Sequence, residues 1–385
     1  MATRIYLDHA STTPVAAEVL EAMLPYLGAR FGNASSLHAR GQAARDAVDQ
    51  ARAAVAGLVR ALPGELLFTA SATESNNLAL KGVALAPGRG RGHLVAAATE
   101  HISILHPLRS LERLGFSVTL APVDRHGHLD PGDLEAALRD DTLLVSVSHA
   151  SGEIGTLQAI EDLARVAHAR GVLFHTDATL TAGALPWPTG PDLPDLVTLT
   201  AHLCYGPQGI AALRVAPGVR LAALIEGGTQ EGGLRAGTEP VATVAGFGAA
   251  ARLAARDMGR RASRANTLAG RLRRGLMTRL DDLVFTGHPE RRLPGHVSLC
   301  VRGVDAEAML RELDSEGIEA ASGSACTTAV RKPSHVLEAI GVDPVSARGA
   351  LTFTFGETNQ DGDAEIVAAT LPRVVARLRE LSPLR

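Results

Sequence analysis

Lysine is nearly absent from this chain of 385 residues. Of its 38 basic residues, only Lys81 and Lys332 are lysines, and all the others are arginines. A guanidinium group is not a usable amine nucleophile. Any chemistry that requires a lysine amine must therefore come from one of these two residues.

Other scarcities exclude whole classes of protein. The chain has three cysteines, too few and too scattered for a disulfide framework or a zinc site, which favours a reducing cytoplasm. The net charge of −3 offers no basic field for nucleic acid or anionic lipid. No apolar run approaches the roughly 20 residues that span a bilayer, and residues 1–8 lack the features of an export signal. We therefore expect a cytoplasmic protein that binds neither nucleic acid nor membrane.

The order of apolar segments predicts an α/β protein. At 385 residues the chain is too long for one ordinary core, so two domains are expected. Short apolar strands alternate with helices, which favours a mostly parallel sheet covered by helices on both faces. Its seven strands are predicted at 66–69, 94–97, 117–121, 143–148, 172–175, 196–200 and 211–215. Helices are predicted at 43–59, 75–83, 103–114 and 157–170.

The pattern changes after about residue 255. A long arginine-rich amphipathic helix is predicted over 241–280. Beyond it we expect strands at 296–301 and 350–355, with helices at 306–316, 334–340 and 361–380. This mixed order predicts a second, smaller α+β domain.

One segment suits the binding of an anion, and a second suits the binding of a nitrogen-containing aromatic ring. At 68–77 a strand gives way to small and hydroxyl residues ahead of a helix, whose free N–H groups and positive dipole end suit phosphate. Serine and threonine also cap helices routinely, so ordinary capping stays open. At 174–178, Asp177 follows an apolar strand, at the edge where α/β proteins place ligands. Its carboxylate suits a pyridinium nitrogen or serves as an ordinary N-cap.

Three further segments contain residues suited to chemistry. His202, in 200–209, also follows a strand, although a single histidine there is more often structural. The glycine run at 227–238 indicates a loop shaped against a ligand or a neighbouring chain, with a merely flexible loop as the alternative. At 321–328, Cys326 lies among small polar residues, where a thiol can act as a nucleophile or sulfur carrier. Cys204 and Cys300 lie in apolar sequence and are expected to be buried.

Together, and in this order and spacing, these segments resemble the cysteine desulfurases, which are class V aminotransferases of the fold type I architecture. The likeness extends from residues 5–14 to residues 353–356. In that family pyridoxal phosphate (PLP) forms a Schiff base with a lysine, and a loop cysteine takes the substrate's sulfur as a persulfide while alanine leaves. The resemblance implies a PLP-transferase-like domain at 14–255. It also implies a small α+β domain made of 1–13 and 256–385, which carries the Cys326 loop.

The resemblance also assigns roles to individual residues. Cys326 matches the persulfide cysteine, with ligation of an iron–sulfur cluster as a further role. His101 matches the histidine that stacks on the cofactor ring, and Asp177 matches the partner of the pyridine nitrogen. The other cofactor-binding positions are Ala72, Thr73, Thr200, His202 and Thr238, the last supplied by the second subunit of a homodimer.

Four departures from the family pattern affect the lysine that attaches the cofactor, the contacts to the cofactor's ring oxygen and the binding of the substrate carboxylate. Leu203 replaces the Schiff-base lysine, and Leu180 replaces a glutamine. Ser151 and Gly152 replace a pair of asparagines. Thr352 replaces the arginine that binds the substrate carboxylate. Without the lysine there is no internal aldimine and no obvious base for the Cα proton. Lys81 is expected to be structural, whereas Lys332 lies on a loop that can swing inward.

We therefore expect a catalytically degenerate cysteine desulfurase homologue. It would accept sulfur or act as a regulatory partner in sulfur and iron–sulfur metabolism, together with an iron–sulfur scaffold or a sulfur-acceptor protein. The alternative is an active desulfurase that binds PLP non-covalently and uses His101 or His202 as base. A PLP enzyme of different chemistry, a transaminase or lyase, is the third hypothesis. The missing lysine and arginine weigh equally against it, and the retained Cys326 makes it the least attractive.

Overall fold

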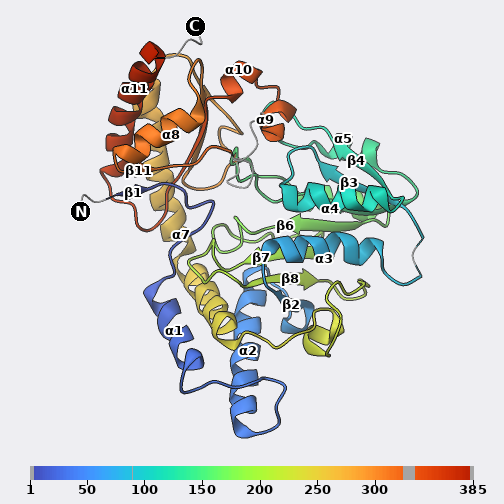
Figure 1. The fold of residues 1–385 in the computed structure, drawn as a ribbon. Coiled ribbons are helices and arrows are strands. Elements are labelled where there is room, and N and C mark those ends of the chain that lie inside the picture. Colours follow the sequence, from blue (N-terminus) through green and yellow to red (C-terminus); the bar gives the residue numbers. More distant parts are fainter. Residues whose placement is uncertain (1–3, 89, 324–333, 382–385) are drawn as a thin grey trace.

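A seven-stranded sheet forms the centre of the computed structural model, which describes residues 4–88, 90–323 and 334–381 (Figure 1). The strand order is β2-β8-β7-β6-β5-β3-β4. Strands β3 to β7 run parallel, and β8 is antiparallel to both of its neighbours. The strands are β2 (Leu66–Thr69), β3 (His93–Ala97), β4 (Ser117–Ala121), β5 (Thr142–Ser146), β6 (Leu173–Asp177), β7 (Leu196–Thr200) and β8 (Ala211–Val215). The predicted mostly parallel, seven-stranded α/β sheet is therefore confirmed.

Helices cover both faces of this sheet, because its strands are apolar on both sides. Every residue of β3 and β7 is buried, as expected for parallel strands between two helical layers. On one face, α3 (Ala72–Ala84) and α4 (Ile102–Arg113) pack against alternate strand residues such as Leu94. On the other face, α2 (Ala39–Leu58), α6 (Ile160–Ala169) and the start of α7 pack against the intervening residues such as Val95.

Helix α7 (Val241–Met277) connects the two parts of the molecule, and it confirms the predicted long helix. Figure 1 shows it running in yellow and orange from α2 and α1 (Ala17–Leu27) up to α11 (Asp363–Leu381). Its last turns join a second core with α8 (Ala306–Ser315) and a three-stranded antiparallel sheet. That sheet contains β9 (Leu283–Phe285), β10 (His296–Val301) and β12 (Ala350–Thr354).

Short elements complete the fold. They are β1 (Ile5–Tyr6), η1 (Pro63–Glu65), α5 (Pro131–Ala137), η2 (Gln230–Gly233), β11 (Ile318–Glu319), α9 (His335–Ala339) and α10 (Pro344–Ala347). Ile5 and Leu7 pack in the second core, although they begin the chain. Within the described ranges, no helix combines the length and the apolar composition that a membrane span requires. The predicted division at residues 13 and 255 stays a prediction.

The prediction for α6 was wrong at its start. A helix was expected from Leu157, but α6 begins at Ile160. Leu157 instead forms a β-bridge with Ala150, and its N–H donates to the carbonyl of Arg291 at 3.0 Å. The apolar periodicity continues through this segment, whereas the backbone hydrogen bonds lead to other parts of the chain.

Candidate functional site

Two of the predicted segments are joined by a chain of hydrogen bonds at the carboxyl edge of the large sheet. Asp177 ends β6, and its Oδ2 accepts from Asn76 Nδ2 of α3 at 2.7 Å. The same amide donates to Ser103 Oγ at 2.9 Å, and Ser103 Oγ lies 2.8 Å from His101 Nδ1. Asp177 Oδ1 accepts from the N–H of Thr179 at 3.0 Å. The carboxylate predicted to pair with a ring nitrogen is thus connected to the histidine predicted to stack on the ring.

The protonation of this histidine follows from its surroundings. Burial lowers the pKa of His101, and the nearby Asp177 carboxylate opposes that change. His101 is also the N-cap of α4, where Nδ1 accepts from the backbone N–H of Ser103 at 3.1 Å. An Nδ1 that accepts a backbone hydrogen bond belongs to a neutral ring with its proton on Nε2. The neutral form suits stacking on an aromatic ring.

The predicted phosphate-binding residues lie around the ends of β2 and β7. Thr69 and Thr200, the last residues of these two strands, are both in register with Ala211 of the intervening β8. Thr73 follows β2 in the first turn of α3 and is exposed. Predicted positions from two distant segments therefore come to one end of the sheet, beside the N–H groups of a helix N-terminus.

Ordinary capping is also present at this helix. Ser71 is the N-cap of α3 and accepts from the N–H of Glu74 at 3.1 Å, while Ala72 and Thr73 begin the helix. The cap uses only one of the four N–H groups that a helix start leaves without an intrahelical partner. Capping is therefore present and does not exclude the predicted anion site, because a capped helix still presents N–H groups.

The residue that takes the place of the family's lysine, Leu203, is half-buried. Leu203 follows His202 and lines a cavity of about 120 Å³ together with Leu180. A Cβ atom on Gly152 would lie 3.2 Å from Leu180 Cδ1, so the leucine side chain occupies the space beside this glycine. Thr352 Oγ1 donates to the carbonyl oxygen of Glu153, the neighbour of Gly152, at 3.2 Å. The four departures from the family pattern thus lie close to one another in space.

No lysine among the residues that the structure describes supplies an amine at this edge. Lys81 is in the last turn of α3, eight residues beyond Thr73. At 1.5 Å per residue that is ~12 Å along the helix axis, away from the end that faces the site. Lys332 and Cys326 lie outside the described residues.

The glycine-rich loop at 227–238 has a defined shape. Glu231 adopts a left-handed backbone with φ of 48°, and its side chain is 3% exposed. Its carboxylate accepts from Arg52 at 2.6 and 2.8 Å and from the N–H of Phe68 at 2.9 Å. Thr238 is exposed at the end of this loop, in a hollow that Thr69 also lines. This geometry favours the shaped loop over the merely flexible one.

The site residues fit the ring and the phosphate of PLP, but they offer nothing that would bond to its aldehyde. Asp177 and His101 suit the ring, and the α3 N-terminus with Thr200 suits the phosphate. Asn76 Oδ1 and Thr200 Oγ1 are buried polar atoms that have no hydrogen-bond partner among the described residues, as expected beside a polar ligand. Leu203 offers no amine for covalent attachment, so the fit is to a non-covalently held cofactor.

The sequence did not identify Asn76 and Ser103, which connect Asp177 to His101. Asn76 is on the buried face of α3, and Ser103 is in the first turn of α4. A fully buried asparagine on a helix is uncommon, because its amide must be hydrogen-bonded. The available signal was the pair Asn76-Asn77 in α3, and it does not reveal which partner the amide meets.

Comparison with known proteins agrees with this geometry. The sequence profile of class V aminotransferases matches residues 5–366. The cysteine desulfurase IscS of Dictyoglomus turgidum is 41% identical, covering 100% of this chain and 98% of its own. Cysteine desulfurase IscS 1 of Archaeoglobus fulgidus is also 41% identical, covering 98% of this chain and 99% of its own.

Solved structures give the same result. A NifS-like protein superimposes with a TM-score of 0.91 at 30% identity, covering 98% of this chain and all of its own. SspA, solved in complex with cysteine, superimposes with a TM-score of 0.81 at 32% identity, covering 92% of this chain and 99% of its own. The family is PLP-dependent, and its fold is the α/β architecture described above. The chain belongs to the cysteine desulfurase family of the class V aminotransferases.

Proposed function

We propose that this cysteine desulfurase homologue does not convert cysteine to alanine and instead serves sulfur and iron–sulfur metabolism as a sulfur-accepting or regulatory partner in the cytoplasm. The observation that carries the proposal is Leu203, an alkyl side chain at the position of the family's lysine. Its apolar neighbour Leu180 and the distance of Lys81 support it. The relatives support the connection to sulfur and iron–sulfur metabolism.

The residues at the sheet edge determine what the chain can do. PLP, when bound, supplies the electron sink for breaking bonds at the amino acid Cα. Here Asp177 would hold the ring nitrogen and His101 would cover the ring, while Thr73, Thr200 and His202 would surround the phosphate. Leu203 neither exchanges with a substrate amine nor takes up a proton. Binding without turnover is therefore the expected outcome.

Cys326 supplies the sulfur-accepting role in this proposal. A thiolate in a run of small polar residues attacks the outer sulfur of a donor persulfide, and the donor thiolate leaves. One sulfur–sulfur bond forms on Cys326 as one breaks in the donor, so the transfer needs no oxidant, reductant or cofactor. The donor is the persulfide of another protein, and the acceptor is an iron–sulfur scaffold or a sulfur-acceptor protein. If Cys326→Ala leaves sulfur transfer and cluster assembly intact, the carrier role is wrong.

A second candidate is an active desulfurase that binds PLP non-covalently. The observation in its favour is the hydrogen-bonded chain from Asp177 to His101, which holds a neutral imidazole at the site. His202 is the other candidate base, and burial lowers its pKa, so it too is neutral at physiological pH. This candidate requires alanine to form from cysteine, whereas the main proposal excludes it.

The decisive experiment compares the wild-type chain with Leu203→Lys in the presence of PLP. We expect the variant to show an absorbance band that borohydride fixes covalently, with a matching mass increase of the intact protein. The wild-type chain should show no covalently fixed cofactor and no alanine from cysteine. Covalent fixation in the wild-type chain would reveal another amine, such as Lys332, and overturn the proposal. Alanine without covalent fixation would instead support the non-covalent desulfurase.

We also propose that the chain forms a homodimer. An exposed apolar stripe on and after α1 supports this proposal, namely Leu20, Leu24, Leu27 and Phe31. Thr238, the predicted contact to the phosphate of the second subunit, is exposed near the same side of the molecule, because Glu239 and Pro240 share a groove with Leu27 and Phe31. A second copy would cover this stripe.

A further inference from the structure

The turn that follows β7 carries His202, a residue assigned to the cofactor phosphate, and a segment near the start of the chain holds this turn. The N–H and the hydroxyl of Thr13 both donate to the carbonyl oxygen of His202, at 2.9 and 2.7 Å, across 189 positions of sequence. Thr13 Oγ1 also accepts from the N–H of Tyr205 at 2.9 Å. Thr13 is 7% exposed, so these bonds are shielded from water. One hydroxyl group thus bridges the two ends of the turn.

The same segment contacts the imidazole ring as well as the backbone. Thr12 Oγ1 lies 3.3 Å from His202 Nδ1 and accepts from Gln208 Nε2 at 3.3 Å. Further along, the N–H of Ala16 donates to the carbonyl oxygen of Tyr205 at 3.0 Å. The segment therefore constrains both the position of His202 and the orientation of its ring.

The turn's own hydrogen bonds do not fix His202. The N–H groups of Cys204 and Gly206 both donate to the carbonyl oxygen of Ala201, at 3.0 and 2.9 Å. Within the described part of the chain, the donors that reach the carbonyl oxygen of His202 both belong to Thr13. The place of His202 within its turn therefore depends on a residue from a distant segment.

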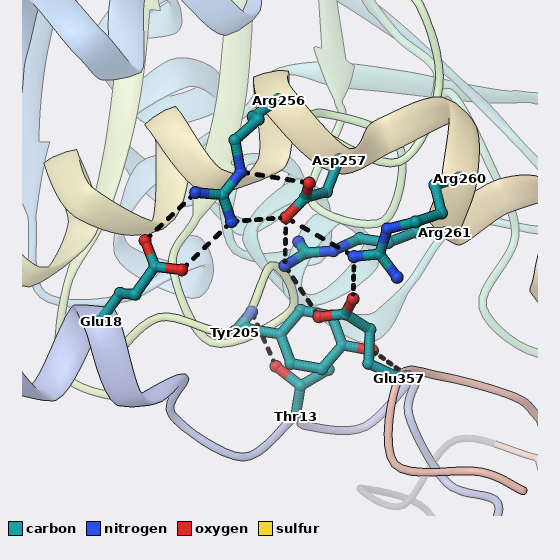
Figure 2. Close-up of polar contacts among 8 residues, drawn as sticks. All are labelled: Thr13, Glu18, Tyr205, Arg256, Asp257, Arg260, Arg261 and Glu357. Atoms are coloured by element: carbon teal, nitrogen blue, oxygen red, sulfur yellow. Dashed lines mark hydrogen bonds and ion pairs between the residues drawn. The ribbon is translucent and has the colours of Figure 1, made fainter.

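The far end of the turn has a strained backbone that a second set of contacts holds. Tyr205 has a left-handed φ of 67°. A residue other than glycine keeps such a conformation only where its surroundings impose it, and such residues cluster at functional sites. Figure 2 shows the Arg261 guanidinium over the ring of Tyr205, at 4.7 Å, and paired with Glu357 at 2.8 Å. The N–H of Glu357 donates to Tyr205 Oη at 2.7 Å, so this end of the turn is fixed while Thr13 holds the other.

The exact place of His202 matters because a phosphate group needs donors that converge on it. Thr200, two residues earlier, ends β7 with a buried hydroxyl oxygen that has no hydrogen-bond partner among the described residues. Thr200 is held in the sheet by its pairing with Ala211. A hydrogen bond weakens steeply as its angle departs from linear. A shift of the turn would therefore remove the contribution of His202 and leave that of Thr200.

We propose that Thr13 is a positioning residue, whose hydroxyl holds His202 where its imidazole meets the phosphate of a pyridoxal-type ligand. The inference rests on the proposed cofactor site, but it does not depend on whether the chain turns over cysteine. Thr13 should contribute to recognition of the phosphate. It should not contribute to recognition of the pyridine ring, which is assigned to His101 and Asp177.

The test compares non-covalent binding of pyridoxine 5′-phosphate with that of pyridoxine, which lacks the phosphate, by titration of the fluorescence of their pyridine ring. Neither probe has an aldehyde, so neither reacts with an amine. We expect the wild-type chain to prefer the phosphorylated probe. Thr13→Val keeps the shape without the hydroxyl and should weaken binding of that probe about tenfold, the worth of one hydrogen bond to a charged group, with pyridoxine binding unchanged. Thr13→Ser keeps the hydroxyl and should restore the preference.

A second buried hydroxyl supplies the matched control. Thr286→Val removes the hydrogen bond from Thr286 Oγ1 to Ser298 Oγ at 2.8 Å, in the smaller sheet, and should leave binding of both probes unchanged. If circular dichroism shows that Thr13→Val folds poorly, Thr13→Ala tests the same hydroxyl. Equal weakening of both probes, an unchanged preference without the hydroxyl, or no recovery in Thr13→Ser would overturn the inference alone. A wild-type chain without any preference for the phosphate would overturn the proposed phosphate site together with it.

Discussion

Glu100 is a carboxyl group that the fold buries next to the candidate site. Its side chain precedes His101, and the residue is 2% exposed. The N–H of Ser148 donates to Glu100 Oε1 at 2.8 Å, and the Ser148 hydroxyl contacts Oε2. Burial nonetheless dominates and raises the pKa of Glu100 from 4.5 to about 8. The folded chain therefore holds a proton at neutral pH that the unfolded chain releases.

This difference gives a pH-dependent stability with a definite sign. Because the folded pKa is raised, the contribution of Glu100 is complete below the unfolded value of 4.5 and is lost as pH rises through about 8. We expect the free energy of unfolding to fall by on the order of 3 kcal/mol between about pH 5 and about pH 8.5. Urea titrations of the wild-type chain and Glu100→Gln at several pH values measure this. The difference between their free energies of unfolding should shrink as pH falls. A difference that does not change with pH would contradict the raised pKa of Glu100.

Single residues also show how far sequence reasoning reaches. Asp177 was placed at the sheet edge because a polar residue after a buried strand has a fixed position in an α/β fold. Asn76 and Ser103 were not found, since their hydrogen bonds depend on two helices that the sheet brings together. Burial of Cys204 and Cys300 was predicted from apolar neighbours and is confirmed. Local pattern thus predicts position and burial, whereas partners across elements require the assembled fold.

At the scale of elements, two glycines of α7 have opposite surroundings. Gly248 faces α2, where an added Cβ would lie 2.6 Å from Ala51 Cα and 2.7 Å from Ala51 Cβ. Gly259 is exposed on the same helix, and an added Cβ there would meet nothing within 4 Å. One helix therefore contains a glycine that permits close packing and a glycine that only weakens the helix.

The same substitution should have opposite effects at these two positions. Gly248→Ala forces α2 and α7 apart and should lower the free energy of unfolding by about 1–3 kcal/mol. Gly259→Ala should raise it by about 0.5–1 kcal/mol, because alanine restricts the unfolded chain and favours the helix. Urea unfolding of the two single variants measures both. Effects of equal sign would show that the packing of α7 on α2 is not what these distances indicate.

The long helix α7 and the strands of the large sheet were predictable, whereas α1 and the two-residue strands were not. The apolar periodicity of α7 continues over many turns, so its existence follows from sequence alone. Helix α1 was not predicted, because its N-cap Ala16 makes no side-chain hydrogen bond and Pro25 interrupts the pattern. Strands β1 and β11 have two residues each and exist only through pairing with each other. Their residues are about 310 positions apart, a contact that no local pattern contains.

At the scale of the whole molecule, the exposed apolar stripe of α1 predicts an assembly. Leu20, Leu24 and Leu27 are exposed at helical spacing, and Phe31 continues the stripe at 61% exposed. Scattered exposed leucines are ordinary, but a contiguous apolar surface usually marks an interface. A groove of about 680 Å³ beside Leu27 and Phe31 also contains Glu239 and Pro240, which follow Thr238. The stripe and the predicted subunit-bridging residue therefore belong to one surface.

Replacing Leu24 and Phe31 by aspartate should make the chain monomeric while leaving it folded, because both side chains are already exposed. Light scattering during size-exclusion chromatography measures the mass, and circular dichroism checks the fold. Leu120→Asp is the matched control, an exposed leucine on β4, which Figure 1 places far from α1. If Thr238 of a second copy contacts the phosphate, the monomeric variant should also bind PLP at least tenfold more weakly, as a fluorescence titration would show. A variant that remains dimeric would place the interface elsewhere, and a monomer with unchanged PLP affinity would remove Thr238 from the site.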